Sequence, residues 1–352
     1  MQTNIVLFSI VVPVFCVEKY LPKCLDSILI YDGLDLEVIC AYDEGHDRSV
    51  EILEEYNKID SRIKLVKCRG KGLSGARNDG ISMASGEIIW FVDADDFIAE
   101  NAINKIIEAY KKDSFDIFVM GTKYEPKGSR VSSFITDSLY TRNVEYDKFH
   151  HNALFRECGA KPFVWRNCYR LMFLKESKIL FDEDNLIGED LAFQMELFPK
   201  AEKIIFRGEK LYNYQWLREG SLQNTYMNNK KKQLYGHVRI VKHVVNNWEK
   251  EGYNKELWTE LYKWSIDFLG EEIPAYGNLE LKCEAKQIIT KIGAVSDKKI
   301  PGFYQNILRS FDDSDTVNHN SIIYKLQHSY YSRGFVRMMY LMINRIRRSK
   351  QK

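Results

Sequence analysis

Short apolar runs alternate with amphipathic segments along the first third of the chain. The runs are rich in β-branched and aromatic residues and lack polar alternation, which is typical of strands covered on both faces of a parallel sheet. Between them, apolar positions recur at helical spacing. The pattern predicts strands at residues 5–14, 36–41, 63–67, 88–92 and 117–123, and helices at 20–29, 49–57, 76–84 and 101–112. This order predicts an α/β protein with a doubly wound sheet.

Carboxylates follow directly after the apolar run at residues 88–92. Asp93, Asp95 and Asp96 stand at the carboxyl end of that predicted strand, where open α/β sheets bind ligands. Carboxylates this close together repel one another, and a cation or a polyhydroxyl ligand would compensate them. Asp93 and Asp95 are therefore candidates for binding a divalent metal and a sugar hydroxyl. The alternative is a turn, or the cap of a helix that starts near Ala99.

The composition bounds the size class and the partners. A chain of 352 residues with 45% hydrophobic content suggests two domains and ample material for a core. The net charge of +2 excludes a chain-wide attraction to nucleic acid. The seven cysteines form no C-x-x-C pair, which is typical of reduced thiols in a cytosolic protein. The apolar residues 5–15 lack a basic flank and are too short to span a bilayer, which favours a first core strand.

Long helical repeats begin at about residue 226. Leu257, Leu261, Trp264 and Phe268 lie on one helical face. Residues 333–352 combine apolar positions at helical spacing with Arg and Lys and contain no acid. They predict a basic amphipathic helix suited to an anionic membrane surface. The alternative is a helix that docks its apolar side on the body and leaves a solvated basic tail.

Five short segments, in order, carry a resemblance to a known family. They are residues 9–15 (SIVVPVF), 42–49 (YDEGHDRS), 72–80 (GLSGARNDG), 93–96 (DADD) and 188–190 (GED). Together they resemble glycosyltransferase family 2, in particular the bacterial capsule and lipopolysaccharide glycosyltransferases. The resemblance implies a GT-A fold, a mixed and mostly parallel Rossmann-like sheet flanked by helices, at residues 1–221. The nucleotide-sugar half would span about 1–120 and the acceptor half about 121–221, followed by a C-terminal helical extension at 222–352.

The resemblance assigns donor-binding roles near the ends of the first two strands. Pro13 and Phe15 would lie beside the nucleotide base, and Asp43 would accept a hydrogen bond from a uracil ring. The chain departs from the family pattern at Tyr42, where an acid or Asn is usual, and at Glu44, where Gly is usual. The identity of the base therefore stays open, although Tyr42 could stack on a ring.

Further donor-side roles fall on the glycine-rich segment and the acidic run. Residues 72–80 suggest a loop entering a helix, whose free N–H groups favour an anionic ligand. Arg77 matches the family's guanidinium near the nucleotide. The D-x-D motif implies that Asp93 contacts ribose and that Asp95 binds Mn²⁺ or Mg²⁺ at the diphosphate, with Asp93 as a second candidate ligand of the metal. Arg218, in a loop resembling the family's Arg-x-Gly-Ser, could reach the diphosphate.

An inverting transfer also needs a base on the opposite face of the sugar. Glu189 and Asp190 open an apolar-periodic helix and match the family's Glu-Asp pair. The resemblance implies that Asp190 is the base and that Glu189 binds or orients the acceptor; plain complementarity of acids to a helix N-terminus is the alternative. Trp165 lies in a segment that resembles the acceptor side of capsule and lipopolysaccharide transferases. It could form a platform under a sugar ring, and a core tryptophan is the alternative.

These features predict an inverting, metal-dependent glycosyltransferase that moves a hexose or N-acetylhexosamine from a UDP-sugar to a glycan acceptor in bacterial surface polysaccharide synthesis. An acceptor on a polyprenyl-diphosphate lipid would place the protein in the cytoplasm, peripheral on the inner face of the membrane. Two other functions stay open. A membrane-associated nucleotide-sugar-binding protein without turnover would need no base such as Asp190. A nucleotidyltransferase would need a basic phosphate-binding loop near the first strand, which residues 15–18 do not provide.

Overall fold

The chain forms two compact units. The computed structural model describes residues 7–31, 34–126, 138–157, 160, 162–184, 187–216, 229–270, 272–296 and 302–312. The first unit spans Met1–Thr225 and the second spans Tyr226–Lys352. In the described residues, the strands all belong to the first unit and the second is helical.

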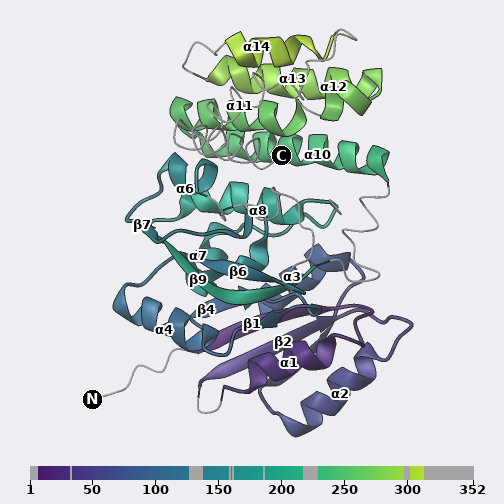
Figure 1. The fold of residues 1–352 in the computed structure, drawn as a ribbon, viewed down its shortest axis with the longest axis vertical. Coiled ribbons are helices and arrows are strands. Elements are labelled where there is room, and N and C mark those ends of the chain that lie inside the picture. The colour runs from purple at the N-terminus through teal and green to yellow at the C-terminus, as the bar shows by residue number, and fades with distance from the viewer. Residues whose placement is uncertain are drawn as a thin grey trace, which may run out of the picture. The chain divides into compact units, whose positions relative to one another are not determined.

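A nine-stranded mixed sheet forms the centre of the first unit (Figure 1). The strand order is β3-β2-β1-β4-β8-β6-β9-β5, and β7 pairs with β9. The first four strands in this order run parallel to one another, so their carboxyl ends meet at one edge. β8 runs antiparallel to both β4 and β6. The strands are β1 Phe8–Val14, β2 Leu36–Tyr42, β3 Ile63–Lys67, β4 Ile88–Phe91, β5 Phe97–Ile98, β6 Ile117–Glu125, β7 Val144–Tyr146, β8 Asn167–Arg170 and β9 Ile204–Gln215.

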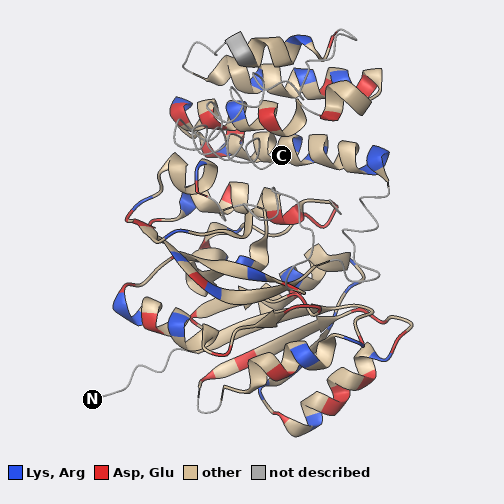
Figure 2. Cartoon of the chain, viewed as in Figure 1, with Lys and Arg blue, Asp and Glu red and all other residues tan. Residues whose placement is uncertain are grey.

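Helices cover both faces of this sheet. α1 and α2 lie on one face, and α3, α7 and α8 lie on the other (Figure 1). The helices are α1 Leu21–Leu29, α2 Ser49–Ile59, α3 Gly72–Met83, α4 Ala102–Lys112, α6 His151–Phe155, α7 Leu171–Ser177 and α8 Glu189–Leu197, with 3-10 turns at η1 Val164–Arg166 and η2 Phe198–Lys200. Figure 2 shows that charged residues concentrate on the helices and loops, whereas β1 and β4 carry none.

The alternation of side chains along β1 explains how both faces are filled. Ile10 and Val12 point into the main hydrophobic cluster, together with apolar residues of α1 and α4. Val11 points the opposite way and meets Gly80 of α3, where an added Cβ would lie 2.3 Å from a Val11 methyl group. All residues of β1 are buried. A strand covered on both faces is mostly apolar, as the sequence pattern indicated, and the one polar residue of β1, Ser9, donates its hydroxyl to the Glu37 carboxylate.

The second unit consists of α10 Lys230–Glu251, α11 Lys255–Leu269, α12 Glu272–Tyr276, α13 Leu279–Val295 and α14 Gly302–Arg309. Asparagine side chains cap three of these helices: Asn229, Asn254 and Asn278 each accept a hydrogen bond from the backbone N–H three residues later. Of the predicted apolar face of α11, Leu257 and Leu261 are buried, whereas Trp264 and Phe268 are half-buried and stack on each other. Among the described residues, no helix combines the length and hydropathy needed to cross a bilayer.

The predicted strands and helices of the first third are present, with small shifts at their ends. The main correction concerns the glycine-rich segment 72–80, which was predicted as a loop leading into a helix. Helix α3 already begins at Gly72. Glycine is required inside it at Gly80 by the contact with Val11. The predicted basic amphipathic helix at 333–352 lies outside the described residues.

Candidate active site

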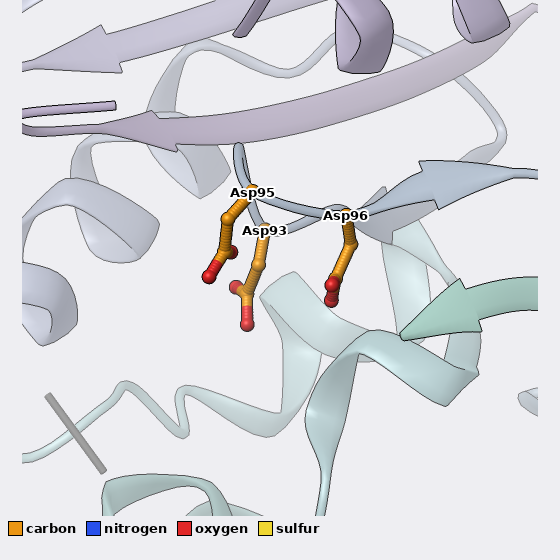
Figure 3. Close-up of side chains that lie close together, drawn as sticks. All are labelled: Asp93, Asp95 and Asp96. Atoms are coloured by element: carbon orange, nitrogen blue, oxygen red, sulfur yellow. The ribbon is translucent and has the colours of Figure 1, made fainter. Parts of the chain in front are cut away.

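Acidic residues gather just beyond the carboxyl end of β4. The side chains of Asp93, Asp95 and Asp96 point to the same side of the β4–β5 loop (Figure 3). One carboxylate oxygen of each lies within 4.8 Å of the others. This edge also receives the carboxyl ends of β1 and β2. The strand pattern therefore places the acids where open α/β sheets bind ligands.

Asp96 is buried and anchors the acidic loop from inside. Its carboxylate accepts hydrogen bonds from the Tyr212 hydroxyl at 2.7 Å and the Gln215 backbone N–H at 2.6 Å. The same hydroxyl accepts a bond from the Asp93 N–H at 3.1 Å. Burial raises the pKa of Asp96 well above its ordinary value, and the charges of Asp95 and Asp93 add to the rise. Strand β9 thus fixes the conformation of the loop that carries the other two acids.

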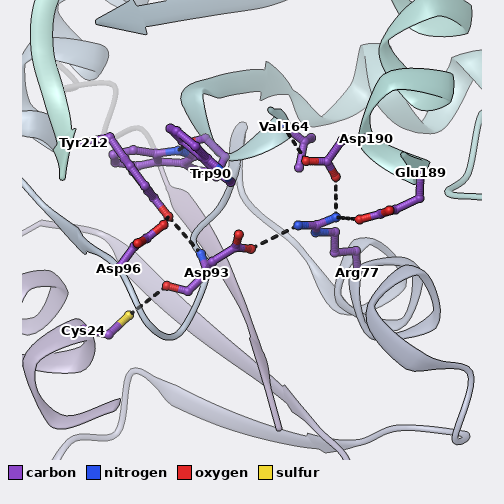
Figure 4. A network of polar contacts seen from close by, with 10 residues as sticks. Cys24, Arg77, Trp90, Asp93, Asp96, Val164, Glu189, Asp190 and Tyr212 are labelled. Carbon is purple, nitrogen blue, oxygen red and sulfur yellow. Dashed lines mark hydrogen bonds and ion pairs between the residues drawn. The ribbon is translucent and has the colours of Figure 1, made fainter. Parts of the chain in front are cut away.

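Arg77 connects this loop to a second pair of acids. Its guanidinium is 1% exposed and contacts Asp93 at 3.0 Å, Glu189 at 3.1 Å and Asp190 at 2.5 Å (Figure 4). Burial by itself would lower the pKa of Arg77, but the three carboxylates, Asp190 foremost, hold that pKa above its usual value. Since one guanidinium touches both, the carboxylates of Asp93 and Asp190 lie no more than about 8 Å apart.

Asp190 lies in the first turn of α8, with 14% of its side chain exposed. Gly188, in the left-handed conformation with φ 73°, precedes the helix. One oxygen of Asp190 bonds Arg77, and the other accepts from the Val164 backbone N–H at 3.1 Å. Burial raises the pKa of Asp190 to about 8; Arg77 opposes the rise, and Glu189 and Asp93 add to it. A carboxylate with a raised pKa is a stronger base than one in water.

Asn78, next to Arg77 on α3, explains how the start of α8 is held near the acidic loop. Asn78 donates from its side-chain nitrogen to the Phe181 carbonyl at 2.9 Å, and its oxygen accepts from the Phe181 N–H at 2.9 Å. Glu183 receives further bonds from Asn78 and Arg69. Helix α3 thereby holds the segment that leads into α8. The contact spans more than a hundred residues of sequence.

The expected nucleotide residues lie along the same edge of the sheet. Pro13 is buried within β1, whereas Phe15, just after the strand, is 56% exposed. Asp43 follows β2, and its side chain accepts a hydrogen bond from the Gly70 N–H at 3.2 Å. An exposed aromatic ring and a carboxylate at the ends of adjacent strands are groups that can stack on a base and accept from its N–H.

One expected site residue, Trp165, lies in the core. Trp165 is 2% exposed, and the rings of Phe163, Tyr212 and Tyr214 stack on it. The sugar platform expected of Trp165 is therefore corrected to a core position, because its ring is covered by aromatic neighbours. Arg218 lies outside the described residues.

The sequence reasoning missed Tyr212 and Val164. Tyr212 bonds Asp96 from a strand that is distant in sequence. Val164 acts through its backbone N–H, a group that almost every residue has, so the residue type does not reveal this role. The run of alternate aromatics at Tyr212, Tyr214 and Trp216 was the available signal for β9, since every second residue of a strand faces the same side.

Comparisons with known proteins identify similar sequences and structures. Residues 9–167 match the family model described as glycosyl transferase family 2. Over these residues the chain carries the sequence pattern of this family. It is 34% identical over 215 residues to the uncharacterized glycosyltransferase EpsJ of Bacillus subtilis (strain 168), covering 59% of this chain and 60% of EpsJ. It is 29% identical over 266 residues to glycosyltransferase GlyA of Streptococcus pneumoniae serotype 4, covering 74% of this chain and 37% of GlyA.

A solved structure extends the likeness in fold beyond the residues that match the family model. The crystal structure of S. aureus TarS 1–349 in complex with UDP-GlcNAc has a TM-score of 0.66 at 18% identity, covering 92% of this chain and 91% of that chain. The likeness confirms the predicted GT-A fold, a mixed and mostly parallel sheet flanked by helices with further helices after it. The chain spans less than two thirds of the length of the first curated relatives that it matches.

Proposed function

We propose that this chain transfers a hexose or N-acetylhexosamine from a UDP-sugar to a glycan acceptor, with inversion at the anomeric carbon. The observation that carries the proposal is the pair of acid sites tied across Arg77: Asp93 and Asp95 at the sheet edge, and Asp190 opposite them. The match to the family model and the UDP-GlcNAc complex of the TarS relative support a nucleotide-sugar donor.

The acidic loop suits a divalent cation. Carboxylate oxygens from Asp93, Asp95 and Asp96 are hard donors, the kind that Mg²⁺ and Mn²⁺ prefer. Asp96 already accepts two hydrogen bonds from protein groups, so Asp95 and Asp93 are the residues we assign to the metal. When bound, the metal would neutralise charge on the departing diphosphate. Tyr212 contributes by keeping the loop in place, through its bonds to Asp96 and the Asp93 N–H.

Asp190 takes the proton from the attacking acceptor hydroxyl. Its two oxygens are oriented by Arg77 and the Val164 N–H, and burial makes it a better proton acceptor than an exposed carboxylate. Glu189, beside it on the first turn of α8, contacts the same guanidinium and orients the acceptor. Arg77 bonds both Asp190 and Asp93, and it thereby fixes the proton acceptor relative to the acidic loop. We assign it this positioning role in place of the direct nucleotide contact first expected.

The base of the nucleotide would lie against Phe15, with Asp43 accepting from its ring N–H and Pro13 ending the strand beneath it. The acceptor would be a growing bacterial cell-surface glycan, in keeping with the glycosyltransferase relatives. We place the protein on the inner face of the cytoplasmic membrane, where an acceptor on a polyprenyl-diphosphate lipid would be presented. The basic residues 333–352 would contact its anionic surface.

A thermal-shift panel tests the donor site. UDP, GDP, CDP and dTDP are added with and without Mn²⁺, since a ligand at a hundred times its Kd stabilises by about 2.7 kcal/mol. We expect the melting temperature to rise with UDP and Mn²⁺ together, and not in Asp95→Ala. Glu54→Ala, which removes an exposed acid on α2, is the matched control and should respond like the wild type. A chain that responds to no nucleotide with any metal contradicts the proposal.

A further inference from the structure

Two half-buried aromatic rings cover the buried Trp165. Phe163 stacks on Trp165 with ring centroids 4.9 Å apart, and Tyr214 does so at 5.0 Å. The centroids of Phe163 and Tyr214 are 5.9 Å apart. If the two rings lay on opposite faces of the indole, their centroids would be at least about 7 Å apart, because each ring needs a contact distance of about 3.5 Å from the indole. Phe163 and Tyr214 therefore lie side by side over the indole, and both keep part of their surface exposed.

This aromatic pair is linked to both acid sites through neighbouring backbone groups. Phe163 precedes Val164, whose N–H bonds the carboxylate of Asp190 at 3.1 Å. Tyr214 precedes Gln215, whose N–H bonds the carboxylate of Asp96 at 2.6 Å. One ring is thus attached to the backbone that holds the base, and the other to the backbone that holds the acidic loop. In Figure 4, Val164 and Asp190 lie on one side of Trp90, and Tyr212 and Asp96 lie on the other.

The support under the pair is rigid. Trp165, beneath it, also stacks on Tyr212 at 4.6 Å, and its carbonyl accepts from the Trp90 ring N–H at 2.6 Å. Tyr212 in turn bonds Asp96. Packed rings with satisfied polar atoms hold one position, and a binding surface built on them is preorganised.

We propose that Phe163 and Tyr214 form the platform on which the acceptor sugar stacks, and that they select an acceptor whose terminal unit is a pyranose ring. A pyranose presents a flat face of C–H groups that packs on an aromatic surface while its hydroxyls point sideways. A ring seated on this pair turns one hydroxyl toward Asp190, to which the platform is joined through Val164. An open-chain polyol phosphate offers no such face. This inference rests on the proposed function, and it names the acceptor class of that site.

The test separates acceptor use from donor use. Phe163→Leu removes the ring and keeps an apolar side chain, and Phe163→Tyr retains the ring. Tyr110→Leu is the matched control, because Tyr110 is another partly buried aromatic, packed on Phe115 away from the acids. Acceptor probes are the octyl glycosides of glucose, galactose and N-acetylglucosamine, against poly(ribitol phosphate). Transfer kinetics, calorimetric binding of each probe and slow hydrolysis of the UDP-sugar by water are measured for every variant.

We expect Phe163→Leu to raise the acceptor KM about tenfold, the size of an aromatic stacking contribution. Its hydrolysis of the UDP-sugar and its UDP affinity should match those of the wild type, and Phe163→Tyr and Tyr110→Leu should keep the wild-type acceptor KM. An unchanged acceptor KM in Phe163→Leu overturns the platform, as does equal loss of donor hydrolysis. Binding and transfer to poly(ribitol phosphate) but to no pyranose also overturns it. Failure of the wild type to bind or hydrolyse any UDP-sugar would instead refute the proposed function.

Discussion

Replacing Arg77 by methionine removes the charge that joins the two acid sites while keeping most of the side-chain volume. Arg77 is 1% exposed and contacts Asp93, Glu189 and Asp190, whose side chains are 24%, 14% and 14% exposed. Without the guanidinium these acids face one another across a buried space. We therefore expect Arg77→Met to destabilise the folded chain and to impair transfer.

The magnitude follows from the burial of the partners. Removing one member of a fully buried ion pair costs about 3–5 kcal/mol, because the remaining charge is left unpaired. The three acids keep some contact with water, which places the loss at the low end, about 3 kcal/mol. For a folded unit of this size each kcal/mol lowers the melting temperature by about 2–4 °C, so a fall of about 6–12 °C is expected. Asp190 should lose its orientation at the same time.

Scanning calorimetry of wild type and variants at pH 9, above the pKa of about 8 of Asp190, measures this directly. The triple variant Arg77→Met/Glu189→Gln/Asp190→Asn removes two of the stranded charges and should recover at least half of the lost stability. Arg48→Met, which removes an arginine that is 69% exposed, is the matched control and should change the melting temperature little. A fall below about 2 °C in Arg77→Met, or no recovery in the triple variant, would refute the idea that Arg77 compensates these acids.

Three further outcomes follow from the same contacts. Asp190 must be ionised to act, and its pKa is raised to about 8. We therefore expect kcat/KM to fall about tenfold per pH unit below pH 8 and to level off above it. Glu189→Gln should move this fall in kcat/KM to lower pH, and a flat profile from about pH 6 to 9 would argue against Asp190 as the base. Tyr212→Phe removes the hydroxyl that bonds buried Asp96 and should cost about 1–3 kcal/mol in urea unfolding, whereas a loss under about 0.5 kcal/mol would show that the bond is dispensable. Gly80→Ala brings a Cβ to 2.3 Å from Val11 and should lower stability by about 1–3 kcal/mol despite its better helix propensity; an unchanged melting temperature would contradict this packing.

The sheet half of the fold could be predicted because its strands are buried on both faces. The runs that became β1 and β4 are apolar except for Ser9, and the helices α1 and α2 between them carry amphipathic stripes. β8 and β9 were harder to predict. β8 is only four residues long and contains Asn167 and Arg170, and β9 mixes charged with aromatic positions. Short antiparallel strands with polar residues give a weak periodic signal.

The acids of the candidate site could be located from their motifs, but their connections could not. Arg77 and Asp190 are 113 residues apart in sequence and 2.5 Å apart in space. No local pattern states that pairing, because the fold alone brings the start of α8 to α3. The placement of Trp165 was likewise undecided between core and platform, since both need the same residue type. Its burial decided the question.

The most direct test of the account compares binding and transfer in one variant, Asp190→Asn. This change removes the proton acceptor and keeps the size of the side chain near Arg77 and the Val164 N–H. Calorimetric UDP affinity in Mn²⁺ and initial rates of sugar transfer are measured side by side with the wild type. The account predicts unchanged UDP affinity and a rate lowered by about 10²–10⁴-fold. Transfer at the wild-type rate would contradict it, because the proton would then have to leave the acceptor by another route.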